Sequence, residues 1–257
     1  MKKLVIIHRI IVLGIVFILP INSSGQTNFQ RWQFGLTISP DYAYRSLHAD
    51  QENEGSSFSI NLMDGIEEGK LGFTAGLNAV CNFSELFSLE TGLLYSNKGY
   101  QIKDIIITDF DGDVLGHGKV VNSYNYIDIP LKINLTLLKW NKIRVLTSAG
   151  VAANLFLDYN KSFIRGSDNW SEDIYDNDLI IKNKINISPM IGVGVEYRIN
   201  EKMSLRALPT VRYSIGESSE MPVYTVDYDT STAYKAVIGK NLWNVGVEFG
   251  FFYGINR

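Results

Sequence analysis

The sequence predicts an all-β protein, an eight-stranded antiparallel transmembrane β-barrel. From Trp32 onward, stretches of roughly ten residues alternate between apolar and polar side chains, as expected of short, tilted membrane strands. Asp, Glu, Lys and Arg are absent from the apolar-rich faces of these stretches, although they make up 20% of the chain. The connections between the stretches alternate between long polar segments and very short turns, which is typical of outer-membrane barrels.

Each expected strand is justified by this alternation, and residues 127–137 give the clearest case. Every odd position from Ile127 to Leu137 is aliphatic, and every even position is polar or proline. Because successive strand residues point to opposite faces, the pattern gives one apolar and one polar face. The other strands follow the same rule. The eight expected strands are residues 32–44, 71–82, 87–98, 127–137, 143–158, 185–198, 203–215 and 243–253.

The charged residues within these strands fix which face points inward. An Arg or Lys facing lipid at the bilayer midplane costs about 2 to 4 kcal/mol, so the charged faces must line the lumen. Eight strands leave an interior just wide enough for side chains, and buried charges must pair. We expect a charge network that plugs the lumen, with a charge-selective pore as the alternative. Its members are Glu90, Asp128, Lys132, Arg144, Glu196, Arg206, Arg212 and Glu248.

The first 25 residues have the pattern of a secretory signal peptide, and residues 26–257 form the barrel domain. Residues 10–19 are apolar, follow a basic start and precede Pro20 and several small residues ending at Gly25. This run is too short to span a bilayer. We expect export and cleavage near Gly25 and Gln26.

Connection lengths predict the orientation in an outer membrane. Short links at residues 82–86, 139–142 and 199–202 should face the periplasm, and long ones at 46–69, 104–121, 159–182 and 217–240 should face outward. Both termini are then periplasmic. We also expect two interfacial aromatic bands. One comprises Trp32, Phe87, Tyr197, Trp243 and Tyr253, and the other Tyr42, Tyr44, Tyr95 and Tyr213.

Four segments resemble recurring segments of the PorT-like outer-membrane β-barrel family of Bacteroidetes. They are residues 72–77 (GFTAGL), 87–99 (FSLETGLLYSNKG), 126–131 (YIDIPL) and 192–197 (GVGVEY). The resemblance extends over nearly the whole mature chain and implies an outer-membrane barrel. Only the namesake branch of the family is tied to type IX secretion. The shared segments are barrel walls, so the resemblance assigns no functional residue.

The residues offer little for catalysis or metal binding. His48 and His117 are the histidines of the mature chain, and neither belongs to a nucleophile motif. A rim site that combines one of them with Ser57, Ser123 or Asp50 is the alternative. Residues 109–113 (DFDGD) resemble a calcium loop, but the glycine comes too early and the closing Glu is missing, so a hairpin tip is expected. We therefore expect no enzyme activity, no cofactor and no metal, and Cys81 as a small lipid-facing filler.

The expected outer loops are acidic and aromatic. Solvated loops are the simpler interpretation. The other is a contact face for a protein or glycan partner, centred on Trp170, Asp173, Tyr224 and Tyr228, or for lipopolysaccharide through shared cations. Nucleic acid would be repelled. We expect a non-enzymatic, monomeric barrel with a structural or surface-interaction role. The alternatives are an accessory part of a secretion or envelope machine and a barrel that handles small solutes or lipids.

Overall fold

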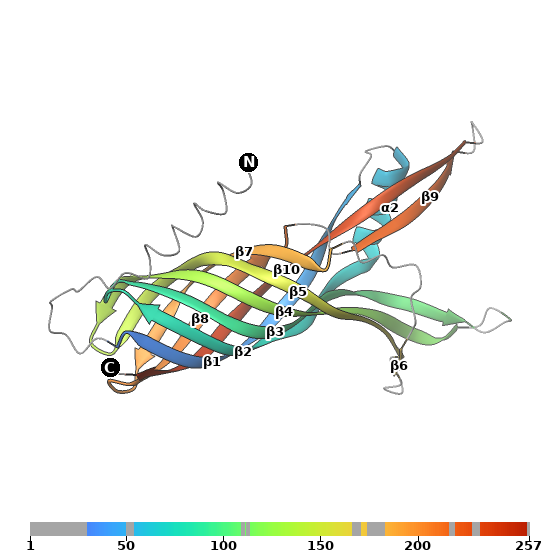
Figure 1. Ribbon diagram of the computed structural model, residues 1–257. Helices are drawn as coiled ribbons and strands as arrows, with labels where there is room; N and C mark the ends of the chain where they lie inside the picture. The colour runs from blue at the N-terminus through green and yellow to red at the C-terminus, as the bar shows by residue number, and fades with distance from the viewer. Residues whose placement is uncertain are drawn as a thin grey trace, which may run out of the picture.

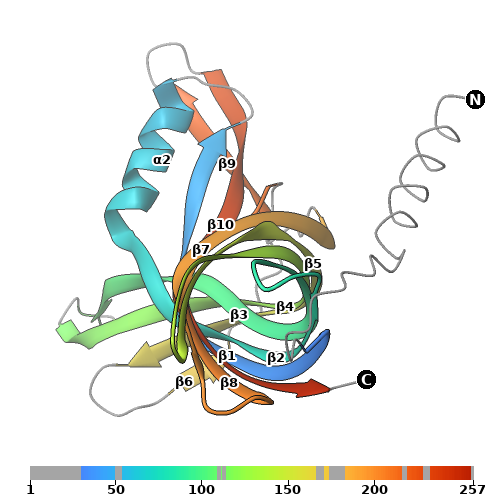
Figure 2. The same ribbon diagram turned by 90° about the vertical axis from the view of Figure 1, so that its left-hand side faces the viewer.

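The computed structural model describes residues 30–49, 54–108, 111, 114–165, 171–173, 183–215, 219–227 and 232–255. Eight antiparallel strands form a closed ring, in which each strand pairs with the next and β1 pairs with β10. Viewed along the barrel, the ring is closed all round (Figure 2). The ring strands are β1 (Trp32–Ala49), β2 (Glu67–Asn82), β3 (Phe87–Thr108), β4 (Val114–Trp140), β5 (Ile143–Arg165), β7 (Ile185–Arg198), β8 (Met203–Tyr213) and β10 (Thr232–Ile255). The predicted fold class is confirmed.

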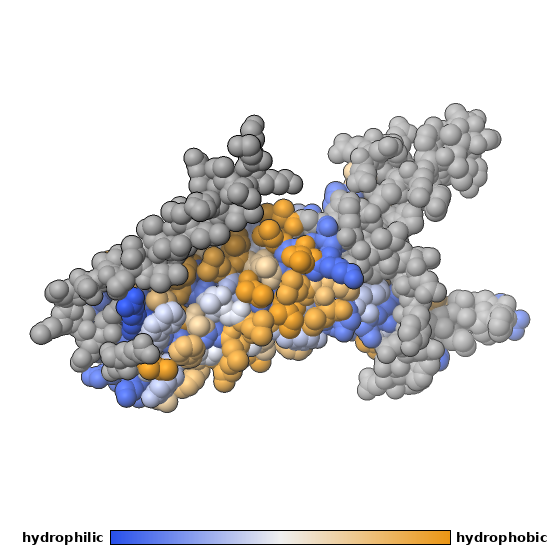
Figure 3. Space-filling view, in the orientation of Figure 1, coloured by the Kyte–Doolittle hydropathy of each residue, from blue (hydrophilic) through white to orange (hydrophobic). Residues whose placement is uncertain are grey.

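Residues that alternate in the sequence point alternately out of the barrel and into its lumen. In β1, residues 34, 36 and 38 are exposed, and residues 35, 37 and 39 are buried. Leu71 in β2 is 84% exposed, and it is one of many large hydrophobic side chains that are exposed on the ring strands. The hydrophobic side chains cover the middle of the barrel wall, with hydrophilic ones toward its ends (Figure 3). This apolar wall has the properties of a lipid-facing surface.

The short links lie together at one end of the barrel. Residues 83–86 join β2 to β3, residues 141–142 join β4 to β5, and residues 199–202 join β7 to β8. Asn141 has a φ of 51°, which asparagine tolerates better than most residues. The Asn200 side chain accepts hydrogen bonds from the backbone N–H groups of Lys202 and Met203, at 2.9 and 2.8 Å. β10 ends at the same end of the barrel (Figure 1).

At the opposite end, the long connections contain a helix and additional strands as well as loops. The expected hairpin of β3 and β4 extends to the pairing of Thr108 with Val114, and most of its tip lies outside the described residues. The segment 46–69 is not a simple loop, since it holds helix α2 (Glu54–Ile66). The segment 217–240 pairs β9 (Ser219–Asp227) with the start of β10, and β6 (Ser171–Asp173) pairs with β5. α2 and β9 lie to one side of the ring (Figures 1 and 2). Within the described ranges, no helix has the length and hydropathy required to cross a membrane.

The expected aromatic bands need one correction. Trp243 was placed beside Trp32 and Tyr253, but it pairs in register with Tyr44 and Tyr213 of the opposite band. The Tyr44 and Trp243 rings meet edge to face, with centroids 5.5 Å apart. β10 runs from the long-loop end toward the short-turn end, so the start of its barrel segment belongs to the far rim. The signal peptide expected at residues 1–25 lies outside the described residues.

Candidate functional site: the charged lumen

Seven of the eight predicted lumen residues form one connected series of ion pairs. Lys132 Nζ lies 2.7 Å from Glu90 Oε1 and 2.9 Å from Glu248 Oε2. Arg206 joins Glu90 to Glu196, at 2.5 and 3.0 Å, and Arg144 pairs with the other oxygen of Glu196. Arg212 continues the series from Glu248, at 2.7 Å. We call this series, together with Asp41 described next, the lumen network.

The series ends on a residue that the sequence reading passed over. Arg212 Nη1 lies 3.7 Å from Asp41 Oδ2, and the Asp41 carboxylate also accepts hydrogen bonds from Ser39 and Thr74, both at 2.6 Å. Gly246 makes room for this carboxylate, since a Cβ there would lie 1.9 Å from Asp41 Oδ1. Asp41 has the same inward parity as Thr37 and Ser39, so the alternation could have found it.

Asp128, the eighth predicted residue, lies apart from the series. Its partners are Lys98 Nζ at 3.1 Å and the Asn154 amide at 2.5 Å. Lys98 was not included in the predicted network. The structure thus places all eight predicted residues in the lumen, but it divides them into two groups.

Every strand of the ring contributes to these contacts. The lumen network draws charges from all ring strands except β2, and β2 supplies Asn78 and Thr74. Asn78 donates a hydrogen bond to Glu90 at 2.9 Å. Thr74 accepts one from Arg212 at 2.9 Å and donates to Asp41. Glu90, Lys132 and Glu196 are each 1% exposed. Charges so deeply buried are tolerable only when their partners are in place.

Toward the short-turn end, an aromatic ring fills the space next to the lumen network. The Arg206 guanidinium lies over the Phe252 ring, 4.3 Å from its centroid. Phe252 is 1% exposed, and glycines on β1 and β10 make room for it. A Cβ at Gly35 or at Gly250 would come within 2.5 Å of this ring. The glycines therefore admit bulky neighbours.

Toward the long-loop end, buried tyrosines and cations replace the ion pairs. Tyr100, Tyr124, Tyr126 and Leu242 form a buried cluster. Lys240 Nζ donates a hydrogen bond to the Tyr100 hydroxyl at 2.6 Å. The Arg45 guanidinium lies 5.5 Å from the Tyr100 ring and pairs with Glu67 and Asp64. Sequence reasoning missed Arg45, which continues the inward parity of Asp41 beyond the strand predicted to end at residue 44.

Lys70, one residue outside the lipid-facing part of β2 that starts at Leu71, has neutral hydrogen-bond partners. Its ammonium donates to Asn97 Oδ1 at 2.6 Å and to Ser123 Oγ at 2.7 Å. The residue is 6% exposed. Burial lowers the pKa of Lys70 to about 8, because no carboxylate among the described residues lies within ion-pair distance to offset the lost hydration.

The other predicted residues are not gathered into a site. Trp170 and Tyr228 lie outside the described residues, and only the backbone is described for Asp173 in β6 and Tyr224 in β9. His48 on β1 pairs in register with Gly239 of β10, and His117 on β4 pairs with Ile106 of β3. The strands that carry the two histidines, β1 and β4, are not neighbours in the ring. Among the described residues, no group of three His, Cys, Asp or Glu side chains could hold a metal ion.

The closed ring, the apolar wall and the charged lumen define a small antiparallel barrel of the membrane-spanning class. No protein-family model and no curated protein matches the sequence. Among solved structures, Neisserial surface protein A is similar over 90% of this chain and 100% of its own, at 11% identity and a TM-score of 0.45. The outer membrane protein OprG from Pseudomonas aeruginosa covers 88% and 98%, at 13% identity and a TM-score of 0.42.

The outer membrane protease OmpT from Escherichia coli is a third structural neighbour. It is similar over 91% of this chain and 99% of its own, at 9% identity and a TM-score of 0.40. The structural neighbours are thus outer-membrane barrels, and one of them is an enzyme. The similarity is one of strand architecture.

Proposed function

We propose that the protein is a non-enzymatic outer-membrane barrel that presents its long-loop end as a contact surface. The lumen network supports the first half of this proposal, which concerns the barrel itself. Opposite charges from seven strands meet in the interior, and each is held by at least one partner of opposite sign. Such an interior favours a rigid, plugged support over a water-filled channel.

The structures beyond the ring support the second half. α2 and β9 project to one side of the ring at the long-loop end (Figure 1). On α2, Phe58, Leu62 and Ile66 follow one another at four-residue spacing and are 67%, 57% and 48% exposed. Exposed apolar side chains gathered on one face are typical of interaction surfaces. We propose a protein or glycan partner for this end, with Trp170, Asp173, Tyr224 and Tyr228 in the contact face, and lipopolysaccharide around the wall.

Replacing the projecting segments tests this role. In one variant, short Gly-Ser links replace residues 166–182 and 217–237, and Phe58, Leu62 and Ile66 of α2 are changed to serine, which leaves the lumen residues and Lys240 in place. The matched control replaces residues 107–115, the tip of the β3 and β4 hairpin, which has no Trp or Tyr. Pull-down from native membranes should lose a partner with the first variant and keep it with the control. If the first variant inserts normally and keeps every partner of the parent, the proposal is wrong.

Location and orientation form part of the proposal. We propose that residues 1–25 are a cleaved signal peptide, that residues 26–257 form the barrel domain, that the barrel is a monomer and that both termini face the periplasm. Protease added to intact cells should then cut at the long-loop end and spare the links at residues 83–86, 141–142 and 199–202. Cleavage confined to these links would reverse the orientation.

A role as an accessory component of a PorT-like secretion or envelope machine is the second candidate. It is supported by the four segments that resemble the PorT-like family, which lie mainly in β2, β3, β4 and β7. A stable multi-protein complex co-purified in mild detergent would favour this role. A monomer that keeps a lipid or solute in its lumen would instead favour solute or lipid handling.

A further inference from the structure

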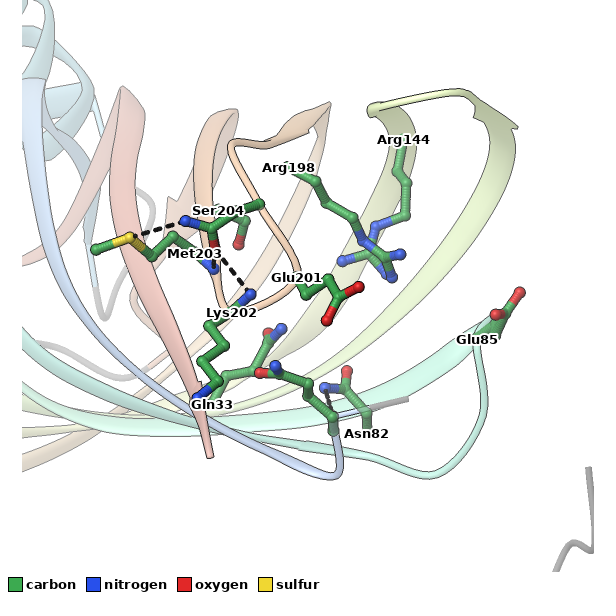
Figure 4. A pocket seen from close by; sticks show the side chains of 11 residues that line it. Gln33, Asn82, Glu85, Arg144, Arg198, Glu201, Lys202, Met203 and Ser204 are labelled. Carbon is green, nitrogen blue, oxygen red and sulfur yellow. Dashed lines mark hydrogen bonds between the residues drawn. The ribbon is translucent and has the colours of Figure 1, made fainter. Parts of the chain in front are cut away.

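A cavity of about 200 Å³ opens at the short-turn end of the lumen. Its lining comes from the ends of β1, β2, β5, β7 and β8 and from two of the short links. Arg144 and Arg198 extend into it from β5 and β7 (Figure 4). Lys202 and Glu201 line it from the link between β7 and β8, and Glu85 from the link between β2 and β3.

The positive charges of this cavity are only partly balanced. The Arg144 guanidinium forms an ion pair with Glu196 through its Nη2 atom. Arg198 has no carboxylate of the described residues within ion-pair distance. It is repelled by the Arg144 guanidinium and attracted from farther away by Glu196 and Glu85. Glu85 is held by Lys139 at 2.6 Å, outside the cavity. Three cations and two carboxylates therefore line the space, and one of the carboxylates is already paired.

Buried polar atoms without partners also line the cavity. Among the described residues, the Arg144 Nε, the Ser204 hydroxyl and both polar atoms of the Gln30 amide have no hydrogen-bond partner. These residues are 8%, 3% and 7% exposed. Buried polar atoms are rarely left unpaired, so three donors and one acceptor clustered at a cavity indicate that a further group forms hydrogen bonds with them.

We propose that this cavity binds a small oxyanion, specifically a phosphate group, between Arg144 and Arg198. The guanidinium N–H groups would donate to its oxygens, with further donors from Ser204 and Gln30. Arginine side chains suit this group because their planar N–H donors match the spacing of phosphate oxygens. The cavity opens at the end that we propose to be periplasmic, so the phosphate would come from a free periplasmic anion or from a phosphorylated headgroup.

Calorimetry on the full-length barrel in an uncharged glycoside detergent tests the proposal. Inorganic phosphate is titrated at constant ionic strength against a chloride reference, and we expect a dissociation constant of about 1 mM or tighter. Arg198→Gln should weaken binding at least about tenfold, as loss of charge-assisted hydrogen bonds does. The matched control is Lys142→Gln, which removes one positive charge from the same rim without lining the cavity. It should leave the affinity within about twofold, since exposed charges at a distance are screened.

A second variant and a second ligand make the result decisive. Glu201→Gln removes a carboxylate from the lining and should tighten phosphate binding. Glycerol phosphate that binds as well as inorganic phosphate would identify a headgroup as the source, and its failure to bind would identify the free anion. The proposal is overturned if phosphate binds the parent no better than chloride, if only the Glu201→Gln variant binds, or if Arg198→Gln and Lys142→Gln have equal effects. A gel comparison of unboiled and boiled samples verifies that each variant is folded.

Discussion

Lys132 and Glu248 are 116 positions apart in the sequence, and their side chains form an ion pair of 2.9 Å across the lumen. They lie on β4 and β10, which share no backbone hydrogen bonds. This pair therefore ties opposite walls of the barrel together through side chains alone. Because both groups are almost fully buried, each depends on the other to offset its lost hydration.

Removing the Glu248 charge should destabilise the barrel strongly. Glu248→Gln leaves both Lys132 and Arg212 with fewer acceptors in the interior, and loss of one buried partner costs about 3 to 5 kcal/mol. The measurement is the urea midpoint of the detergent-solubilised protein. Glu85→Gln is the control, because the exposed pair of Glu85 with Lys139 should contribute about 1 kcal/mol or less. Equal shifts for the two variants would show that water reaches the lumen network.

The parent protein should not carry a steady ion current. The lumen network crosses the interior from Arg144 to Asp41, and Phe252 fills the space beside Arg206. A permeating ion would have to break several buried pairs at once. Single-channel recording in planar bilayers tests this expectation, with a porin of known conductance inserted as a positive control. A reproducible open level would favour the charge-selective pore.

Stability should depend on the ionisation of Lys70. Its pKa is 10.5 when unfolded and about 8 in the barrel, so the unfolded chain binds more protons between these values and stability rises with pH there. Below pH 8 the buried ammonium costs about 3 kcal/mol. The stability of Lys70→Met relative to the parent should therefore be greatest at pH 7 and should shrink as pH rises toward 10.5. Urea midpoints at pH 7, 9 and 10.5 measure this difference. A difference that stays constant with pH would contradict the prediction, and the exposed Lys142→Met should show that constant behaviour.

The closed ring should survive SDS without heating. β1 pairs with β10 along most of its length, so no strand of the ring has a free edge in the barrel wall from which to unravel. Unboiled and boiled samples should therefore migrate at different apparent masses. A variant that ends at residue 242 lacks most of the closing strand and should migrate identically under both conditions. Identical migration of the parent would contradict a closed barrel.

The alternation of residues was enough to predict the eight strands, because lipid on one side and packed charge on the other enforce a period of two. The face of the barrel to which a residue such as Leu71 or Lys132 points can thus be predicted from its position in the alternation. The pairings were not predictable in the same way. Whether Arg206 meets Glu90 or Glu248 depends on strand tilt and on the stagger of the ring, which distant residues decide together.

α2 was missed because its sequence gives mixed signals. Gly55, Ser57, Ser59 and Gly65 are weak helix formers, which favoured a loop. The spacing of Phe58, Leu62 and Ile66 was the signal that could have revealed it. The site at the short-turn end could not have been found from sequence, since Arg144 and Arg198 become neighbours only when β5 and β7 pair. Trp243 was misplaced for a simpler reason, namely that the direction of β10 was not applied to its first residue.

The seam between β1 and β10 joins the first strand of the chain to the last, and it brings Asp41 and Glu248 to the same arginine. Glu248 is synthesised after all other residues of the lumen network. Until then, Arg212 and Lys132 lack one of their acceptors, and the half-made sheet has two open edges. The ring can therefore close only after β10 has been synthesised.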